Sequence, residues 1–249
     1  MLANGRLERL REKKVGLIVA SFTGGYFILL LITPLMLPTD SIPELSGRAN
    51  RIDYATDDGW GSWGNQNHGE NAEIGHNQEE IGLFSWSELN PLAAFVYFIG
   101  DLNCHQKYER SWEINGNQLA VCVRDVGLFL GLALGALFWR KKGLNRWTIR
   151  DSFLSVFSDE KIEFLYKEDR RLLAMILLVS LGAIPIGLDG FTQLLTSYES
   201  TNIVRLITGT GAGFVLSWWS CAAISSRPDN FDSADLVKLP ANAKLVFRD

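Results

Sequence analysis

The side chains with the greatest capacity for chemistry lie in one short polar segment, 104–125, which separates two apolar stretches. This segment contains two of the three cysteines, Cys104 and Cys122, together with His105 and Asp125. Two thiolates, an imidazole and a carboxylate form a ligand set that four-coordinate zinc accepts, and iron is an alternative. The segment therefore predicts a metal site with Cys104, His105, Cys122 and Asp125 as ligands.

The spacing of these residues supports the site only in part. Cys122 and Asp125 are three residues apart, so they share a face if a helix begins there. Cys104 and His105 are adjacent, and both can bind one ion only if the backbone turns between them. Two alternatives remain open: a Cys104–Cys122 disulfide that ties a hairpin together outside the cytoplasm, and two unmodified thiols. A hydrogen-bonded structural role fits His105 equally well.

A second group of polar residues lies at 188–205. Asp189 and Gln193 are four residues apart and Asn202 and Arg205 are three apart, so each pair can share a helical face. We interpret Asp189 and Glu199 as acid/base groups of a metal-dependent reaction, or as residues that orient the ligands.

Arginines accompany both polar groups. Arg110, Arg124 and Arg205 can pair with the carboxylates at positions 125, 189 and 199 as a structural network. Alternatively, a guanidinium is left to bind a phosphate or carboxylate. In that second interpretation Gln193 and Asn202 join the three arginines as anion-binding residues.

The composition indicates a membrane protein. Apolar residues make up 47% of the 249 residues. They are concentrated in long runs separated by polar segments, which is the distribution that a bilayer requires. The net charge of −4 and the lack of a basic face argue against nucleic-acid binding. Three cysteines are too few for a disulfide scaffold, and Cys221, inside an apolar run, is interpreted as a small buried side chain.

We predict an all-α polytopic transmembrane bundle with four spans and one partial helix. About 20 apolar residues are needed to cross a hydrocarbon core of roughly 30 Å. The predicted spans are 15–37, 126–139 with an extension over 119–123, 172–188 and 203–223. The apolar segment 91–103 is too short to span, so we interpret it as re-entrant or packed against the bundle.

Basic residues set the expected orientation. They cluster in 1–14 and 140–150, and the positive-inside rule places both clusters in the cytoplasm. Counting 91–103 as a full span would move the second cluster outside. With 91–103 as a partial helix, both termini are cytoplasmic, and the segments 104–125, 189–193 and 199–205 share the non-cytoplasmic face.

The expected organisation follows from these spans. It consists of a basic cytoplasmic N-terminus (1–14), the first span (15–37), a non-cytoplasmic acidic loop rich in Gly, Asn and Trp (38–90), a membrane core with the polar site (91–223) and a cytoplasmic tail (224–249). His68 and His76 are conceivable metal ligands in the loop, but a solvated insertion is the simpler interpretation.

Two further patterns concern packing. Gly127, Gly131 and Gly135 recur every four residues, which favours close approach of another helix. Segment 151–167 has apolar residues on one helical face with charges between them. That pattern predicts an amphipathic helix lying on the membrane surface.

Several blocks of sequence resemble an uncharacterised membrane-protein family, domain of unknown function 2085 (DUF2085). The main blocks are Cys-His-Gln at 104–106, Ala-Val-Cys-Val-Arg-Asp at 120–125, Leu-Asp-Gly-Phe-Thr-Gln at 188–193 and Glu-Ser-Thr-Asn-Ile-Val-Arg-Leu-Ile-Thr-Gly at 199–209. The resemblance covers about 92–220 and implies that these polar blocks belong to one site. It also implies a family in which Cys can replace Asp125, giving a Cys-x-x-Cys pair; the aspartate keeps a ligand but weakens a dithiol interpretation.

Together these features predict a metal-binding membrane protein, with a metal-dependent enzyme acting on a lipid or amphiphile as its most specific form. The alternative is a non-catalytic membrane subunit whose polar blocks are structural and whose Cys104 and Cys122 form a disulfide. A transporter is the third option, and four spans without an evident internal repeat argue against it.

Overall fold

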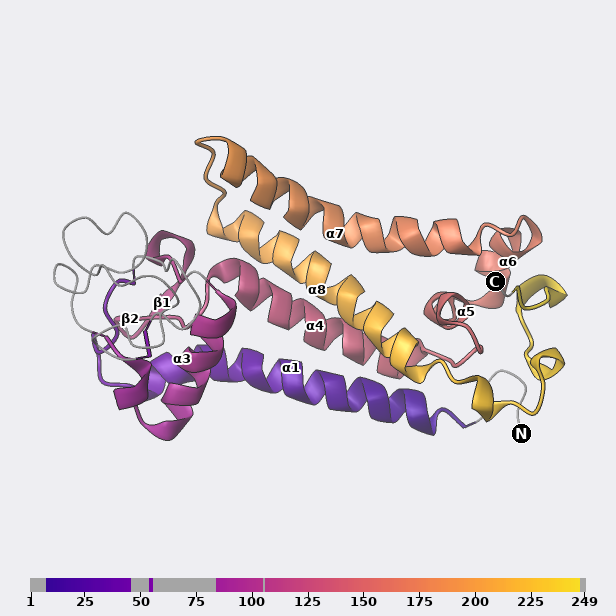
Figure 1. The fold of residues 1–249 in the computed structure, drawn as a ribbon, viewed down its shortest axis with the longest axis horizontal. Coiled ribbons are helices and arrows are strands. Elements are labelled where there is room, and N and C mark those ends of the chain that lie inside the picture. Colours follow the sequence, from indigo (N-terminus) through magenta and orange to yellow (C-terminus); the bar gives the residue numbers. More distant parts are fainter. Residues whose placement is uncertain (1–7, 46–53, 56–83, 105, 247–249) are drawn as a thin grey trace. The chain divides into compact units, whose positions relative to one another are not determined.

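The computed structural model describes residues 8–45, 54–55, 84–104 and 106–246 (Figure 1). Within these residues, the seven α-helices are α1 (Leu10–Met36), α3 (Pro91–Asn103), α4 (Val123–Lys142), α5 (Ile149–Leu154), α6 (Asp159–Lys167), α7 (Arg171–Leu195) and α8 (Asn202–Ser225). Two short antiparallel strands, β1 (Glu113–Ile114) and β2 (Asn117–Gln118), form a hairpin between α3 and α4. The predicted helical class is confirmed.

The chain divides into two compact units. The helical unit contains the described parts of 1–24, 128–198 and 208–249, and the hairpin unit contains those of 25–127 and 199–207. The cysteines and aspartate of the predicted metal site lie in the hairpin unit, together with Arg110, Arg124, Glu199 and Arg205. Asp189 and Gln193 belong to the helical unit.

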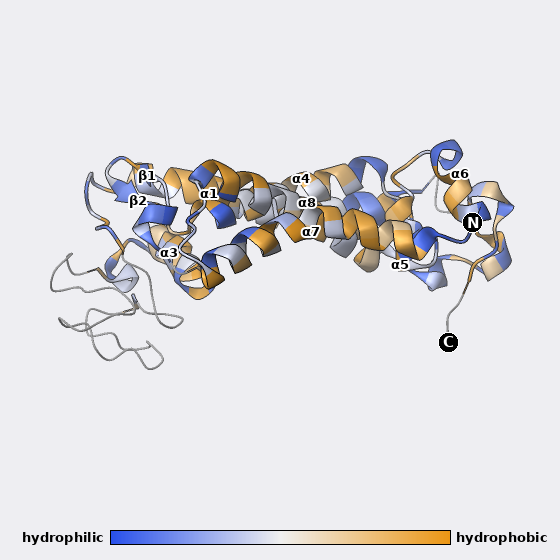
Figure 2. Ribbon diagram, turned by 90° about the horizontal axis from the view of Figure 1, so that it is seen from above, coloured by the Kyte–Doolittle hydropathy of each residue, from blue (hydrophilic) through white to orange (hydrophobic). Residues whose placement is uncertain are grey.

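Among the described helices, three are long and apolar enough to cross a membrane: α1, α7 and α8. Apolar residues line α7 along most of its length (Figure 2). The fourth predicted span, 126–139, is the centre of α4, which has charged residues at both ends and does not meet the same criterion. Helix α7 continues to Leu195, so Asp189 and Gln193 lie inside a helix rather than beyond its end.

Glycines allow α4 and α8 to pack closely in the helical unit. A Cβ atom on Gly131 would collide with the backbone of Thr210 and Phe214, and one on Gly213 would collide with the backbone of Leu128. The predicted close helix contact is therefore confirmed, since a Cβ atom on Gly127 or Gly135 would likewise collide with the α8 backbone. The helices lie side by side along this contact (Figure 1).

The segment 151–167 departs from its prediction. It contains parts of two short helices, α5 and α6, rather than one surface helix. Phe153 and Leu154 are fully buried, and the Phe153 ring stacks on Trp218 of α8 at 4.0 Å between centroids. The prediction was wrong here because an amphipathic pattern shows that a face is apolar but not whether lipid or protein covers it.

The ends of three helices meet in the helical unit. The Arg9 guanidinium donates three hydrogen bonds of 2.9 Å to carbonyl groups of 140–143, where α4 ends. Arg11 Nη2 donates to the carbonyl of Ile224, near the end of α8, at 2.8 Å. The beginning of α1 therefore lies beside the ends of α4 and α8, so α1 is antiparallel to both.

The hairpin unit is built around a tight turn. Asn115 and Gly116 both have positive φ, 57° and 69°, as a two-residue hairpin loop requires. Side chains of the second strand then hold the segment after α1: Asn117 Oδ1 accepts from the N–H of Ile42 at 2.8 Å, and Gln118 Oε1 accepts from the N–H of Leu45 at 2.7 Å. This anchoring fixes the hairpin that joins the two candidate cysteine segments.

Candidate functional site

Cys104 lies at the C-terminal end of α3. Its backbone N–H donates to the carbonyl of Gly100 at 2.8 Å, which closes the last helical turn. A Cβ atom on Gly100 would collide with the carbonyl of Ala120, so only glycine lets α3 approach the segment after β2. This contact brings the end of α3 next to the start of α4.

The sulfur of Cys104 is surrounded by backbone donors. It accepts hydrogen bonds from the N–H of Cys122 at 3.1 Å and from the N–H of Gln106 at 3.4 Å. Gln106 adopts a positive φ of 49°, so the backbone turns sharply two residues after Cys104. Donors directed at a sulfur favour its negative form, which is the form that binds a metal.

Cys122 and Asp125 meet at the start of α4. The Cys122 carbonyl accepts from the N–H groups of Asp125 and Val126 at 3.0 and 3.1 Å, so the helix begins there. The Cys122 thiol lies 3.5 Å from Asp125 Oδ2. The sulfurs of Cys104 and Cys122 and a carboxylate oxygen of Asp125 all lie within 4.8 Å of one another.

Opposing influences act on the ionisation of Cys104. Its pKa is raised well above the ordinary value, first by the hydrogen bond with the Cys122 thiol and then by burial, while the backbone N–H of Cys122 acts in the opposite direction. Both cysteines are free thiols in the structure. A metal cation would deprotonate them, because coordination outweighs the cost of burying a thiolate.

The predicted histidines cannot be placed. His105, His68 and His76 lie outside the described residues, as does most of the 38–90 loop. His105 as a fourth ligand therefore stays a prediction from its position beside Cys104.

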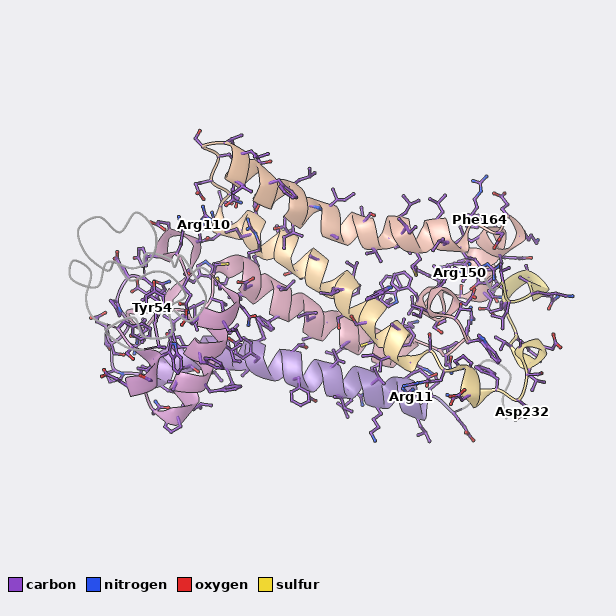
Figure 3. All side chains as sticks on the ribbon, viewed as in Figure 1. Arg11, Tyr54, Arg110, Arg150, Phe164 and Asp232 are labelled. Atoms are coloured by element: carbon purple, nitrogen blue, oxygen red, sulfur yellow. The ribbon has the colours of Figure 1, made fainter. Side chains whose placement is uncertain are left out.

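Glu199 joins two of the predicted anion-binding arginines. Arg110 ends a short 3-10 turn before β1 (Figure 3). Arg110 Nη2 donates to Glu199 Oε1, and Arg205 Nη2 donates to Glu199 Oε2 at 2.7 Å. The hydrogen bond from Arg110 is the main cause that lowers the pKa of Glu199. A carboxyl group that stays ionised suits a charge partner better than a proton donor at neutral pH.

Arg205 is the more firmly held of the two arginines. It is 3% exposed, and its Nη1 donates to Asn202 Oδ1 at 3.0 Å. Asn202 in turn donates to the carbonyl of Ser111 at 3.3 Å, which ties the start of α8 to the segment before β1. Arg124 lies half-buried in the first turn of α4.

Asp189 and Gln193 contact each other on α7. Gln193 Nε2 donates to Asp189 Oδ2 at 2.9 Å and to the Asp189 carbonyl at 3.0 Å. Asp189 is 7% exposed. Because both residues belong to the helical unit, the structure brings together the predicted site residues of 104–125 and 199–205 within the hairpin unit, and holds 189–193 in the other unit.

Glutamine side chains that sequence reasoning passed over hold the cysteine segments together. Gln106 Nε2 donates to the Ala120 carbonyl at 2.7 Å, and Gln118 Nε2 donates to the Gln106 carbonyl at 2.9 Å. Both residues are buried. Gln106 could have been found from its place in the Cys-His-Gln block, whereas nothing in the local sequence marks Gln118.

Comparison with known proteins places this site within a wider group. A family model described as a predicted membrane protein (DUF2085) matches residues 104–219. The match begins at Cys104 and includes Cys122, Asp125, Glu199 and Arg205. No solved structure matches significantly.

Two uncharacterised archaeal proteins are similar to this chain. One, from Methanocaldococcus jannaschii, is 32% identical over 124 residues, which are 50% of this chain and 65% of that protein. The other, from Methanothermobacter thermautotrophicus, is 33% identical over 114 residues, 46% of this chain and 80% of that protein. The match thus covers slightly less than two thirds of the first relative.

Proposed function

Because this chain belongs to the DUF2085 family of predicted membrane proteins, we propose that it is an integral membrane protein whose hairpin unit binds a metal ion. Cys104, Cys122 and Asp125 are the proposed ligands from the described residues, with His105 as the fourth. Zinc is the preferred ion for two thiolates, one carboxylate and one imidazole, and iron is the second choice.

The observation that carries this proposal is the convergence of three ligand atoms within 4.8 Å. Tetrahedral zinc with ordinary bond lengths holds a sulfur and an oxygen ligand about 3.6 Å apart and two sulfurs about 3.8 Å apart. The Cys122 sulfur and Asp125 Oδ2 are 3.5 Å apart, so this pair needs almost no movement to share an ion. The backbone donors at Cys104 further support a sulfur that carries negative charge.

The proposed alternative is a non-catalytic membrane subunit with a Cys104–Cys122 disulfide. In that case the sulfurs would form a covalent bond, and Asp125 would have no ligand role. The position of Asp125 beside Cys122 supports the metal, because a carboxylate is a ligand for a cation but takes no part in a disulfide.

We further propose four spans, α1, α4, α7 and α8, with α3 as a partial helix and both termini in the cytoplasm. The contacts of Arg9 and Arg11 support this arrangement because they place the start of α1 beside the ends of α4 and α8. If α1 and α4 both cross the bilayer in opposite directions, α3 cannot be a complete span. Helix α4 has 20 residues, and about 30 Å of helix is enough to cross the hydrocarbon core.

Metal content tests the proposal. The full chain, purified in detergent without chelator, is expected to contain nearly one zinc or iron per chain by elemental analysis. Cys122→Ser is expected to remove the metal, and Cys221→Ser, a matched change at a buried cysteine of the helical unit, is expected to retain it. Metal-free parent protein with a Cys104–Cys122 disulfide by non-reducing mass spectrometry would overturn the proposal in favour of the alternative.

A further inference from the structure

We propose that the pocket beside Arg110 and Arg205 binds a phosphate-bearing anion, which takes the place of the Glu199 carboxylate between the two guanidinium groups. The pocket has a volume of about 310 Å³ and lies entirely within the hairpin unit. Its lining residues are Lys107, Glu109, Arg110, Glu199, Ser200 and Arg205.

The geometry of Glu199 shows what the pocket recognises. One carboxylate oxygen is bound by Arg110 and the other by Arg205. Clusters of arginines are a recurrent means by which proteins bind phosphate, and guanidinium groups pair with carboxylates and phosphates alike. Glu199 therefore occupies the position that an external anion of this chemistry would take.

The two sides of this contact differ in how firmly they are held. The Glu199 side chain is 59% exposed and belongs to the connection before α8. The Arg205 side chain is 4% exposed and is fixed by Asn202. Glu199 can move into solvent at little cost, whereas Arg205 stays in place. This difference allows an incoming anion to displace the carboxylate without rebuilding the pocket.

Charge favours the exchange. The lining contains three cationic side chains and two carboxylates, so its net charge is positive even with Glu199 in place. The pocket also adjoins the first turn of α8, which has no acidic residue. The positive end of a helix adds to the attraction for an anion.

A phosphate group could reach this pocket from two sources. Arg205 lies in the first turns of α8, a candidate span, so the pocket is at the depth where lipid headgroups lie if α8 crosses the bilayer. A soluble phosphate compound presents the same oxygens. The chemistry of recognition is shared, and the source is decided by experiment. The inference does not depend on a bound metal, because none of the lining residues is a proposed ligand.

The test uses the full chain in two arms. Binding of inorganic phosphate is measured by calorimetry in detergent, and retention of phosphatidylglycerol against phosphatidylcholine is measured by native mass spectrometry. We expect Arg205→Gln to weaken binding about tenfold or more, because it removes a charge-assisted hydrogen bond. We expect Glu199→Ala to strengthen binding severalfold, since it removes the competing carboxylate. Glu109→Ala changes a lining carboxylate that belongs to no described ion pair with either arginine, so it serves as the matched control for Glu199→Ala.

The outcomes separate the sources. Selective retention of phosphatidylglycerol with weak phosphate binding identifies a lipid headgroup, and the reverse identifies a soluble phosphate compound. No binding in either arm, or unchanged affinity in Glu199→Ala, would overturn the inference and make Glu199 a structural ion-pair partner. Both binding measurements are repeated in Cys122→Ser, the variant expected to lose the metal. Unchanged anion binding in that variant would show that the anion pocket does not depend on the metal site.

Discussion

The backbone N–H of Cys122 lies 3.1 Å from Sγ of Cys104 and donates a hydrogen bond to it across 18 residues of chain. This bond joins the end of α3 to the start of α4. Because the donor is a backbone group, replacing the Cys122 side chain by serine leaves the donor in place while removing one ligand. The loss of metal expected in Cys122→Ser can therefore be attributed to the missing thiolate rather than to separation of the two segments.

Close packing of α4 on α8 should tolerate no side chain at Gly131. We expect Gly131→Val to lower the free energy of unfolding by about 1–3 kcal/mol, because its added atoms would meet the α8 backbone rather than a movable side chain. Gly187→Val is the matched control, since a Cβ there meets no atom within 4 Å. Thermal unfolding in detergent compares the two variants. Equal melting temperatures would show that α4 and α8 are not packed at this position.

The glycine contact was predictable from sequence, but the burial of Phe153 and Leu154 in segment 151–167 was not. Glycine at every fourth position has one common explanation in a membrane helix. An apolar helical face has two possible explanations, because either lipid or the protein interior can cover it. Phe153 is covered by Trp218, which lies 65 residues later in the chain, and no local pattern specifies that pairing.

In the candidate site, too, the sequence predicted some features and not others. Residue types indicated Cys104, Cys122 and Asp125, because few side chains bind metals and these three are close in sequence. Their convergence depends on Gly100, which allows close approach to Ala120, and on the buried amides of Gln106 and Gln118. Gly100, Gln106 and Gln118 hold together segments that are far apart in the sequence, through close backbone approach and side-chain hydrogen bonds. Sequence spacing alone does not specify such contacts.

The proposed topology predicts which cysteine substitutions can be labelled from each side. Lys142→Cys at the exposed end of α4 should react with a membrane-impermeant thiol reagent only when the cytoplasmic side is accessible. Ser197→Cys, exposed between α7 and α8, should react from the opposite side. Labelling of the parent chain is measured in parallel and subtracted, because its native cysteines can also react. Labelling of both substitutions from one side would contradict α7 as a span.

The ion pair of Glu199 predicts a small dependence of stability on pH. The pKa of Glu199 is lowered from its ordinary value of 4.5 in the folded protein, chiefly by Arg110. A lowered pKa contributes stability above the unfolded value, and this contribution is lost as pH falls through the folded value. The carboxylate is 59% exposed, so we expect only about 0.2–1 kcal/mol.

The comparison is between the parent and Glu199→Gln. The parent should melt at a slightly higher temperature at about pH 6.5, and the difference should shrink as the pH falls below the ordinary carboxyl value of 4.5. Glu109→Gln reports the general effect of acid on the hairpin unit. A difference that is constant across this range would show that Glu199 contributes through packing rather than charge.

Asp125 offers the sharpest distinction between metal binding and dithiol chemistry. Asp125→Ala should weaken zinc binding by more than the roughly 10–100-fold typical of losing a residue that only orients a ligand, because a direct ligand is lost while the two sulfurs remain. Asp125→Cys should preserve stoichiometric metal, since a third thiolate replaces the carboxylate at the same helical position. Cobalt substitution should then show stronger sulfur-to-metal absorption in Asp125→Cys than in the parent. Unchanged zinc affinity in Asp125→Ala would refute the role of Asp125 as a ligand.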